Sequence, residues 1–295
     1  MKKICVIGAG TMGNGIAHCF AQQDFEVNLI DVSLENLEKS QETINNNLDR
    51  MIKKDVIKKL EKEAILNRIS FYTDIEKAIL DIDLVIEAVT ESKNIKLNIF
   101  KTLDSKCHPK TILASNTSSI SIQEIGAVTN RPDKVIGMHF MNPVPIMKLV
   151  EVIKSKKTSE NTINSIMNLS RELNKKPVLV NDSPGFVANR ILLPMINESI
   201  HTLEEQVSGV KEIDMVMILG MSHPMGPLHL ADFIGLDVCL SILEVLYSGF
   251  NDKKYQPCKL LKDMVRDGEL GVKTKKGFYD YTSGIKNKMV SERFI

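Results

Sequence analysis

The chain of 295 residues lacks several features that mark other classes of protein. Its 38 lysines and arginines face 37 aspartates and glutamates, so it has no basic surplus of the kind typical of nucleic-acid-binding proteins. No apolar run approaches the roughly 18 residues that a transmembrane helix needs. The apolar stretch before Gly8 is too short for a secretory signal. We therefore predict a soluble, cytoplasmic protein that acts without nucleic acid or a membrane.

Cysteine is also scarce, and its spacing excludes common cysteine sites. The five cysteines are far apart and none forms a Cys-x-x-Cys pair; they are Cys5, Cys19, Cys107, Cys239 and Cys258. Such spacing favours neither disulfides nor a thiolate zinc site. No mixed group of histidine, cysteine and carboxylate has the spacing of metal ligands either. We predict a reducing compartment and no metal.

The first half of the chain alternates short β-branched runs with longer helical patterns. The expected strands are 3–7, 26–30, 83–89, 111–115, 134–140, 147–153 and 177–181. The expected helices are 11–23, 34–65, 93–106 and 160–174. This alternation is typical of repeated βαβ units around a mainly parallel sheet, which is an α/β fold.

The pattern changes at Ser183, after which it is helical until 278–281. Ser183 and Pro184 suit the cap and first position of a helix. We therefore predict a sheet-containing domain over 1–182 and an all-helical domain over 183–295. No Gly/Ser-rich linker separates the two.

A glycine-rich motif follows the first expected strand and opens the first expected helix. It reads Gly8-Ala9-Gly10-Thr11-Met12-Gly13, and Asp31 ends the second strand. In this context the motif is the dinucleotide-binding fingerprint, with glycines for the turn, the approach of a pyrophosphate and helix packing. Asp31 can accept ribose hydroxyls, and the residues after it offer no cation for a 2′-phosphate. The sequence therefore predicts a Rossmann-like domain that binds NAD.

Polar residues follow three of the expected strands, at the edge where such sheets bind ligands. They are Thr90 and Glu91, then 116–119, and then His139 with Asn142. If the chain turns back around Pro145, His139 comes to lie opposite Glu151 on the next strand. A histidine held by a carboxylate is a common general base.

Each of these residues also has a structural interpretation. A lone histidine in a strand is more often structural than catalytic. Ser118 could simply cap the helix that begins near Ile120, and Asn189 could be an ordinary helical residue. From the residues alone, the chemistry of this edge stays open.

Six motifs in order along the chain indicate which chemistry this edge of the sheet carries out. Beside the fingerprint, they are Ala114-Ser115-Asn116-Thr117-Ser118-Ser119, Gly137-Met138-His139-Phe140-Met141-Asn142-Pro143, Pro184-Gly185-Phe186-Val187-Ala188-Asn189-Arg190, His223-Pro224-Met225-Gly226-Pro227 and Lys276-Gly277-Phe278-Tyr279-Asp280-Tyr281. Together they resemble the 3-hydroxyacyl-CoA dehydrogenase family, from the first strand to about residue 282. The resemblance implies hydride transfer between an (S)-3-hydroxyacyl-CoA, such as 3-hydroxybutyryl-CoA, and NAD. It also implies a homodimer formed through the helical domain.

The resemblance also implies roles for individual residues. His139 matches the base, Glu151 the carboxylate that orients it, and Ser118 and Asn189 the residues that hold the substrate oxygen. The implied cofactor positions, beyond the fingerprint and Asp31, are Glu91, Lys96, Asn116 and Lys275. The implied substrate positions, beyond Ser118, are Asn142, Lys53 and Lys54.

One departure concerns the CoA-binding region. Family members commonly have Gly-Lys where this chain has Asp55-Val56, so a lysine that could meet a CoA phosphate is missing there. Lys53, Lys54, Lys58 and Lys59 are the candidates to replace it.

Two other functions compete with this interpretation. One is a dehydrogenase of a free hydroxy acid, which usually relies on a Gly-x-x-Gly-x-x-x-Lys motif that is absent around Gly185. The other is a catalytically idle NAD-binding protein on the same fold. The presence of both His139 and Glu151, with Ser118 and Asn189, counts against the second.

Overall fold

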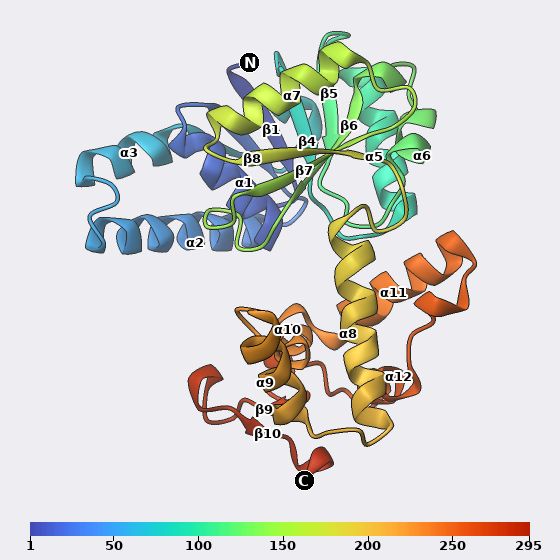
Figure 1. The fold of residues 1–295 in the computed structure, drawn as a ribbon. Coiled ribbons are helices and arrows are strands. Elements are labelled where there is room, and N and C mark those ends of the chain that lie inside the picture. The colour runs from blue at the N-terminus through green and yellow to red at the C-terminus, as the bar shows by residue number, and fades with distance from the viewer. The chain divides into compact units, whose positions relative to one another are not determined.

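A computed structural model describes all residues from 1 to 295. The chain divides into two compact units, Met1–Ser183 and Pro184–Ile295, which we call unit 1 and unit 2. Unit 1 runs from blue to yellow-green in Figure 1, and unit 2 from yellow to red. Each unit has its own cluster of buried apolar side chains.

Unit 1 is built on one sheet of eight strands. In chain order they are β1 Lys3–Ile7, β2 Glu26–Ile30, β3 Ile69–Tyr72, β4 Leu84–Glu87, β5 Ile112–Ser115, β6 Val135–Phe140, β7 Leu149–Lys154 and β8 Lys176–Asn181. Their order across the sheet is β3-β2-β1-β4-β5-β6-β7-β8. All neighbours are parallel except β6 and β7. The chain order reverses at β1, and this switch point is where open α/β sheets bind ligands.

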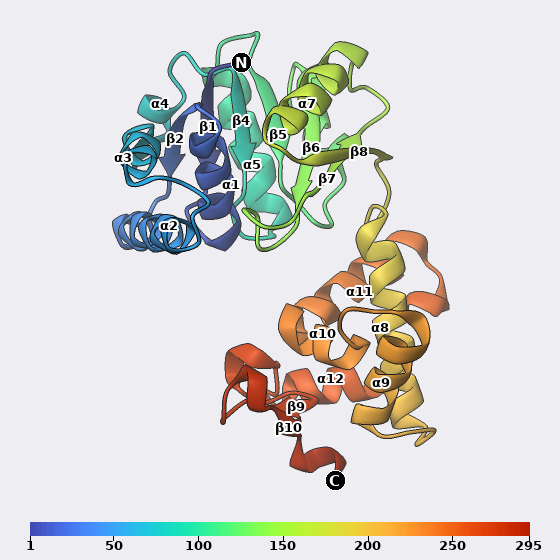
Figure 2. The same cartoon turned by 60° about the vertical axis from the view of Figure 1, so that its left-hand side comes forward.

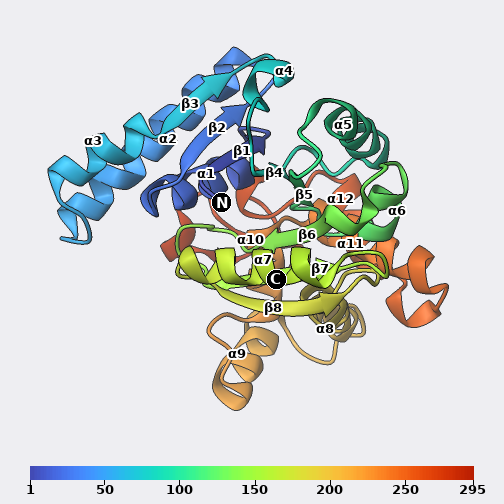
Figure 3. The same cartoon turned by 90° about the horizontal axis from the view of Figure 1, so that it is seen from above.

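Helices cover both faces of this sheet. One face carries α1 Thr11–Gln22 and α7 Glu160–Glu172, and the other carries α5 Lys93–Lys106 and α6 Ile122–Ala127 (Figure 3). The short α4 Ile75–Ala78 precedes β4, and α2 Leu34–Lys53 packs on α1. The central strands are buried along their whole length, as expected for strands covered on both faces. The predicted Rossmann-like fold with a mainly parallel sheet is confirmed.

Two helix predictions were wrong in their bounds. The expected helix 34–65 is two helices, α2 and α3 Lys59–Asn67, because the chain turns between them through Asp55, which has a φ of 55°. The edge strand β3, which follows α3, was not predicted. The helix expected from Pro184 begins instead at Ala188, because Gly185 and Phe186 have positive φ angles that no right-handed helix accepts.

Unit 2 is helical, as predicted. Its helices are α8 Ala188–Glu204, α9 Val210–Met221, α10 Pro227–Ile234, α11 Leu236–Phe250 and α12 Lys259–Arg266. The other four helices all pack against or near α8 (Figure 2). The predicted strand at 278–281 is β9 Tyr279–Asp280, which pairs with β10 Met289–Val290.

The buried carboxylate of Asp232 joins the segment 278–281 to α10 of unit 2. Asp232 on α10 accepts hydrogen bonds from the backbone N–H groups of Phe278 and Tyr279 and from the hydroxyl of Tyr281. Burial raises the pKa of Asp232 to about 6 in spite of these donors. The motif at 276–281 therefore has a structural role in closing unit 2.

Three further observations concern the cysteines, metal ligands and membrane-spanning helices. All five cysteines are buried and unpaired. No group of three or more histidine, cysteine or acidic side chains is arranged to hold a metal ion. None of the helices combines the length and the apolar character needed to cross a bilayer.

His18 on α1 makes the stability of unit 1 sensitive to acid. It is completely buried, and neither ring nitrogen has a hydrogen-bond partner. Burial, and then the charge of Lys175, lower its pKa from 6.5 to about 4. Because the unfolded chain binds this proton at a higher pH than the folded chain does, acid favours unfolding from about pH 6.5 downward.

We therefore expect His18→Leu to flatten the loss of stability between pH 7 and pH 5. Between pH 7 and pH 5, the free energy of unfolding of the parent protein should fall by about 2 kcal/mol more than that of H18L, as measured by denaturant unfolding. His108→Leu, at an exposed position, is the matched control and should keep the parent slope. Parallel loss of stability in H18L and the parent protein would show that His18 is not the source.

Candidate active site

The dinucleotide turn joins β1 to α1, and its glycines are required by close backbone contacts. Gly8 has a φ of 100°, and a Cβ there would lie 2.7 Å from the carbonyl oxygen of Ala88. A Cβ on Gly13 would lie 1.8 Å from the carbonyl oxygen of Gly8. Gly10 differs, because a Cβ there would meet no protein atom within 4 Å. The turn thus leaves open space at Gly10, where a ligand can approach the backbone at the start of α1.

Asp31 follows β2 directly and is fixed by its neighbours. Its carboxylate accepts hydrogen bonds from the backbone N–H groups of Ala9, at 2.8 Å, and Ser33, at 2.9 Å. The bond to Ala9 links Asp31 to the glycine turn itself. Together, the open backbone at Gly10, the start of α1 and the fixed carboxylate fit the phosphates and ribose of NAD.

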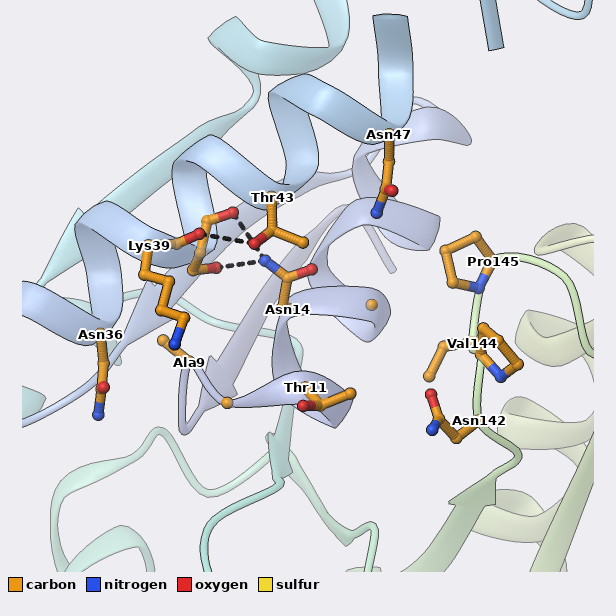
Figure 4. Close-up of a pocket in the computed structure, with 14 residues that line it drawn as sticks. Ala9, Thr11, Asn14, Asn36, Lys39, Thr43, Asn47, Asn142, Val144 and Pro145 are labelled. Carbon is orange, nitrogen blue, oxygen red and sulfur yellow. Dashed lines mark hydrogen bonds between the residues drawn. The ribbon is translucent and has the colours of Figure 1, made fainter. Parts of the chain in front are cut away.

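A pocket of about 280 Å³ lies beside this turn, between α1, α2 and the loop after β6 (Figure 4). Thr11 faces it from the start of α1 and Asn142 from the loop after β6, and Lys39 and Asn47 line it from α2. Neither Lys39 nor Asn47 was predicted from the sequence. Their spacing places them on one face of α2, because residues on one helix face recur every three or four positions, but spacing does not show that this face lines a pocket. Lys39 is the one cation among the lining residues.

His139 and Glu151 form a buried pair on adjacent strands. β6 and β7 are antiparallel, with His139 directly opposite Glu151, so the predicted register is confirmed. The two side chains are 6% and 2% exposed, and Nδ1 of His139 lies 2.8 Å from Oε2 of Glu151. An ionised Glu151 can only accept, so Nδ1 carries a proton, and in the neutral ring the lone pair is on Nε2. This is the tautomer that a general base needs.

Ser118 lies on the other side of the same ring. Its Oγ is 3.1 Å from Nε2 of His139, in the turn that follows β5. The three side chains therefore form a row, Ser118–His139–Glu151, at the carboxyl end of the parallel strands. A hydroxyl or carbonyl oxygen of a substrate beside Ser118 would be within reach of Nε2.

Glu91 organises the turn that carries Ser118. One of its carboxylate oxygens accepts hydrogen bonds from the backbone N–H groups of Ser118 and Ser119, both at 2.9 Å, and from the hydroxyl of Thr117. Burial by itself would raise the pKa of Glu91, but Lys96 and the donors in this turn outweigh it and hold the pKa below its usual range. Glu91 therefore stays ionised and keeps the turn in shape.

Several other predicted site residues have clear positions in unit 1. Asn116 is buried, and its side-chain oxygen accepts the backbone N–H of Phe140, next to His139. Lys96 is buried, with its ammonium 2.6 Å from Glu87. The lysines Lys53 and Lys54 are exposed at the end of α2, outside the set of pocket-lining residues. The structure does not bring these two together with Ser118 or His139.

Two predicted site residues belong to unit 2. Asn189 is the second residue of α8. Lys275 has a φ of 61°, and its carbonyl oxygen accepts the backbone N–H of Tyr281. Their proposed roles toward cofactor and substrate stay predictions.

Comparison with known proteins identifies the family. Residues 3–183 match the NAD-binding domain of 3-hydroxyacyl-CoA dehydrogenase, and residues 185–281 match its C-terminal domain. The chain belongs to the 3-hydroxyacyl-CoA dehydrogenase family. It is an NAD-dependent oxidoreductase by this membership, in agreement with the glycine turn and Asp31.

Individual relatives cover nearly the whole chain. A probable 3-hydroxybutyryl-CoA dehydrogenase of Bacillus subtilis is 54% identical over 95% of this chain and 98% of its own length. The mitochondrial hydroxyacyl-coenzyme A dehydrogenase of Homo sapiens is 39% identical over 95% of this chain and 91% of its own. The crystal structure of (S)-3-hydroxybutyryl-CoA dehydrogenase from Ralstonia eutropha matches with a TM-score of 0.92 and 46% identity, over 96% and 99% of the two chains.

Proposed function

We propose that this chain interconverts (S)-3-hydroxybutyryl-CoA and acetoacetyl-CoA with NAD as the cofactor. The observation that carries the proposal is the row Ser118–His139–Glu151 beside a complete dinucleotide turn. Relatives of about 50% identity carry the name of this activity, and that supports the four-carbon substrate.

The row supplies the proton chemistry of the reaction. In oxidation, Nε2 of His139 takes the proton from the C3 hydroxyl, while Glu151 stabilises the imidazolium that forms. In reduction, the same nitrogen returns the proton to the C3 oxygen. Such proton transfer contributes roughly 10²- to 10⁴-fold to a rate. Bound NAD supplies the two-electron acceptor for the oxidation.

The contacts to the substrate follow from the same proposal. Ser118 holds the C3 oxygen near His139, and Asn189 is the second residue proposed for this task. For CoA, we propose Asn142 and the lysines Lys53 and Lys54. Lys39 supports an anionic group in the pocket beside α2, because it is the cation that lines this pocket.

The assay that tests the proposal follows the absorbance of NADH in the presence of acetoacetyl-CoA. Free acetoacetate and NADPH run in parallel. Oxidation of NADH that requires the CoA thioester supports the proposal, and a weak response to NADPH supports the role of Asp31. Turnover of free acetoacetate instead would indicate a hydroxy-acid dehydrogenase. NADH binding without turnover of either compound would indicate an idle binding protein.

Removal of the Ser118 hydroxyl should affect turnover more than cofactor binding. We expect Ser118→Ala to lower kcat by about 10- to 100-fold, because the substrate oxygen loses a hydrogen bond that aligns it with His139. NADH affinity, measured by its fluorescence, should change little. Ser105→Ala removes an exposed hydroxyl on α5 and is the control. An unchanged kcat in S118A would remove Ser118 from the proposed contacts.

We also propose a homodimer formed through unit 2 and a cytoplasmic location. The first is supported by apolar side chains exposed along α9, namely Met215, Val216, Ile218, Leu219 and Met221. The second is supported by the five unpaired cysteines. Light scattering of the purified protein tests the dimer.

A further inference from the structure

Glu87 is a fully buried carboxylate with a complete set of partners. It ends β4, directly opposite Ser115 at the end of β5. Its Oε2 accepts the hydroxyl of Ser115 at 2.6 Å. Its Oε1 accepts the ammonium of Lys96 at 2.6 Å and the backbone N–H of Val89 at 2.7 Å. A buried charge is unfavourable unless it is paired and bonded in this way, so the site around Glu87 is highly ordered.

One chain of contacts leads from Glu87 to the turn after β5 through Ser115. Because the Ser115 hydroxyl donates to Glu87, its oxygen is left to accept the backbone N–H of Thr117, at 3.2 Å. The carbonyl oxygen of Glu87 also accepts the backbone N–H of Asn116, at 2.7 Å. The start of the turn is therefore fixed by Glu87.

A second chain of contacts reaches the same turn through Lys96. Glu87 holds the Lys96 ammonium, which also lies 3.3 Å from Oε2 of Glu91. The other oxygen of Glu91 accepts the backbone N–H groups of Ser118 and Ser119. Lys96 thus sits between two carboxylates, and its position determines how firmly Glu91 can hold the turn.

The first chain ends at Thr117, next to Ser118, and the second ends at Ser118 itself. The hydroxyl of Ser118 lies 3.1 Å from Nε2 of His139. We propose that Glu87 is a positioning residue for the reaction: it neutralises Lys96 and fixes Ser115, and through them it keeps Ser118 aligned with His139. Without the Glu87 charge, the buried ammonium would have Glu91 as its carboxylate partner. It would draw Glu91 away from the turn, and Ser118 would move.

The decisive variant is Glu87→Gln, which keeps the shape of the side chain and removes its charge. With acetoacetyl-CoA and NADH, we expect kcat to fall about tenfold or more, with the KM for acetoacetyl-CoA within about threefold of the parent value, because misalignment near the reacting atoms affects turnover more than substrate binding. Ser115→Ala interrupts only the first chain of contacts and should give a smaller fall in kcat.

The matched control is Asp104→Asn. Asp104 also lies in unit 1, and the substitution also removes an ion pair, the 2.8 Å contact between Asp104 and Arg131. This pair is at the carboxyl end of α5, whereas Lys96 is near the start of the same helix. D104N should lower the melting temperature and leave kcat within about twofold of the parent value.

A second readout does not depend on turnover. The 15N resonance of His139 Nε2 reports its hydrogen bond with Ser118, and it should shift in E87Q and not in D104N. The activity readout rests on the proposed reaction, whereas the resonance does not, so an inactive parent protein would overturn the function and leave the positioning role testable.

Two outcomes would overturn the inference. One is a kcat in E87Q that equals that of D104N, and the other is a fall in kcat with an unchanged Nε2 resonance. If E87Q fails to fold, Ser115→Ala decides by the same two readouts, because it removes one buried hydroxyl and no charge.

Discussion

Replacing His139 with Gln should lower kcat for acetoacetyl-CoA reduction by about 10³-fold or more, with little change in NADH affinity. Glutamine has nearly the polarity and length of histidine but cannot take up and return a proton. NADH affinity should persist, because Asp31 is hydrogen-bonded to Ala9 and Ser33, whereas the His139 side chain is hydrogen-bonded to Glu151. Stopped-flow turnover and NADH fluorescence measure the two quantities.

Glu151→Gln tests the partner of the base. The amide can donate to Nδ1 of His139, which favours the tautomer with its proton on Nε2 and removes the lone pair that accepts the substrate proton. We expect kcat to fall by about 10²-fold or more. His108→Gln, at an exposed histidine of the same unit, should keep full activity. Normal turnover in either H139Q or E151Q would exclude the pair from the mechanism.

Gly13→Ala should abolish NADH binding. The added Cβ would lie 1.8 Å from the carbonyl oxygen of Gly8. That oxygen is a backbone atom and a Cβ cannot rotate away from it, so α1 must move away from the turn. We expect at least a 100-fold loss of NADH affinity together with a lower melting temperature, since both depend on the packing of α1 against β1. Isothermal titration and thermal unfolding measure the two effects.

Two other glycines separate packing from ligand contact. Gly10→Ala meets no protein atom within 4 Å, so it should keep the melting temperature and weaken NADH binding, because the Cβ projects toward the ligand. Gly220→Ala, near the end of α9 and equally free of contacts, should change neither quantity to a comparable extent. Unchanged NADH affinity in G13A would show that this turn is not the cofactor site.

Local patterns allowed much of unit 1 to be predicted from the sequence. Strands buried on both faces are continuous apolar runs, so β1, β4 and β6 were predicted to within two residues at every end. The short edge strand β3 was missed, because it has only four residues and is partly exposed. The turn at Asp55 was missed because a left-handed residue inside a helical pattern leaves no periodic signal.

The candidate site was predictable to a different degree. The turn expected around Pro145 predicted that His139 and Glu151 lie opposite each other on adjacent strands, and β6 and β7 have that register. Lys39 was not predicted, because a single lysine on a polar helix looks like any other exposed lysine. Whether it faces a pocket depends on the loop after β6, which is more than 100 residues away in the sequence.

The sequence by itself determined the fold class, the dinucleotide turn with Asp31, and the identity of the family, because these depend on short motifs with strict backbone or packing requirements. Only the tertiary structure decided that Glu91 holds the Ser118 turn and that Glu87 and Lys96 lie buried beneath it. These contacts join the ends of different strands and helices. Their partners are set by three-dimensional packing, for which spacing along the chain carries no signal.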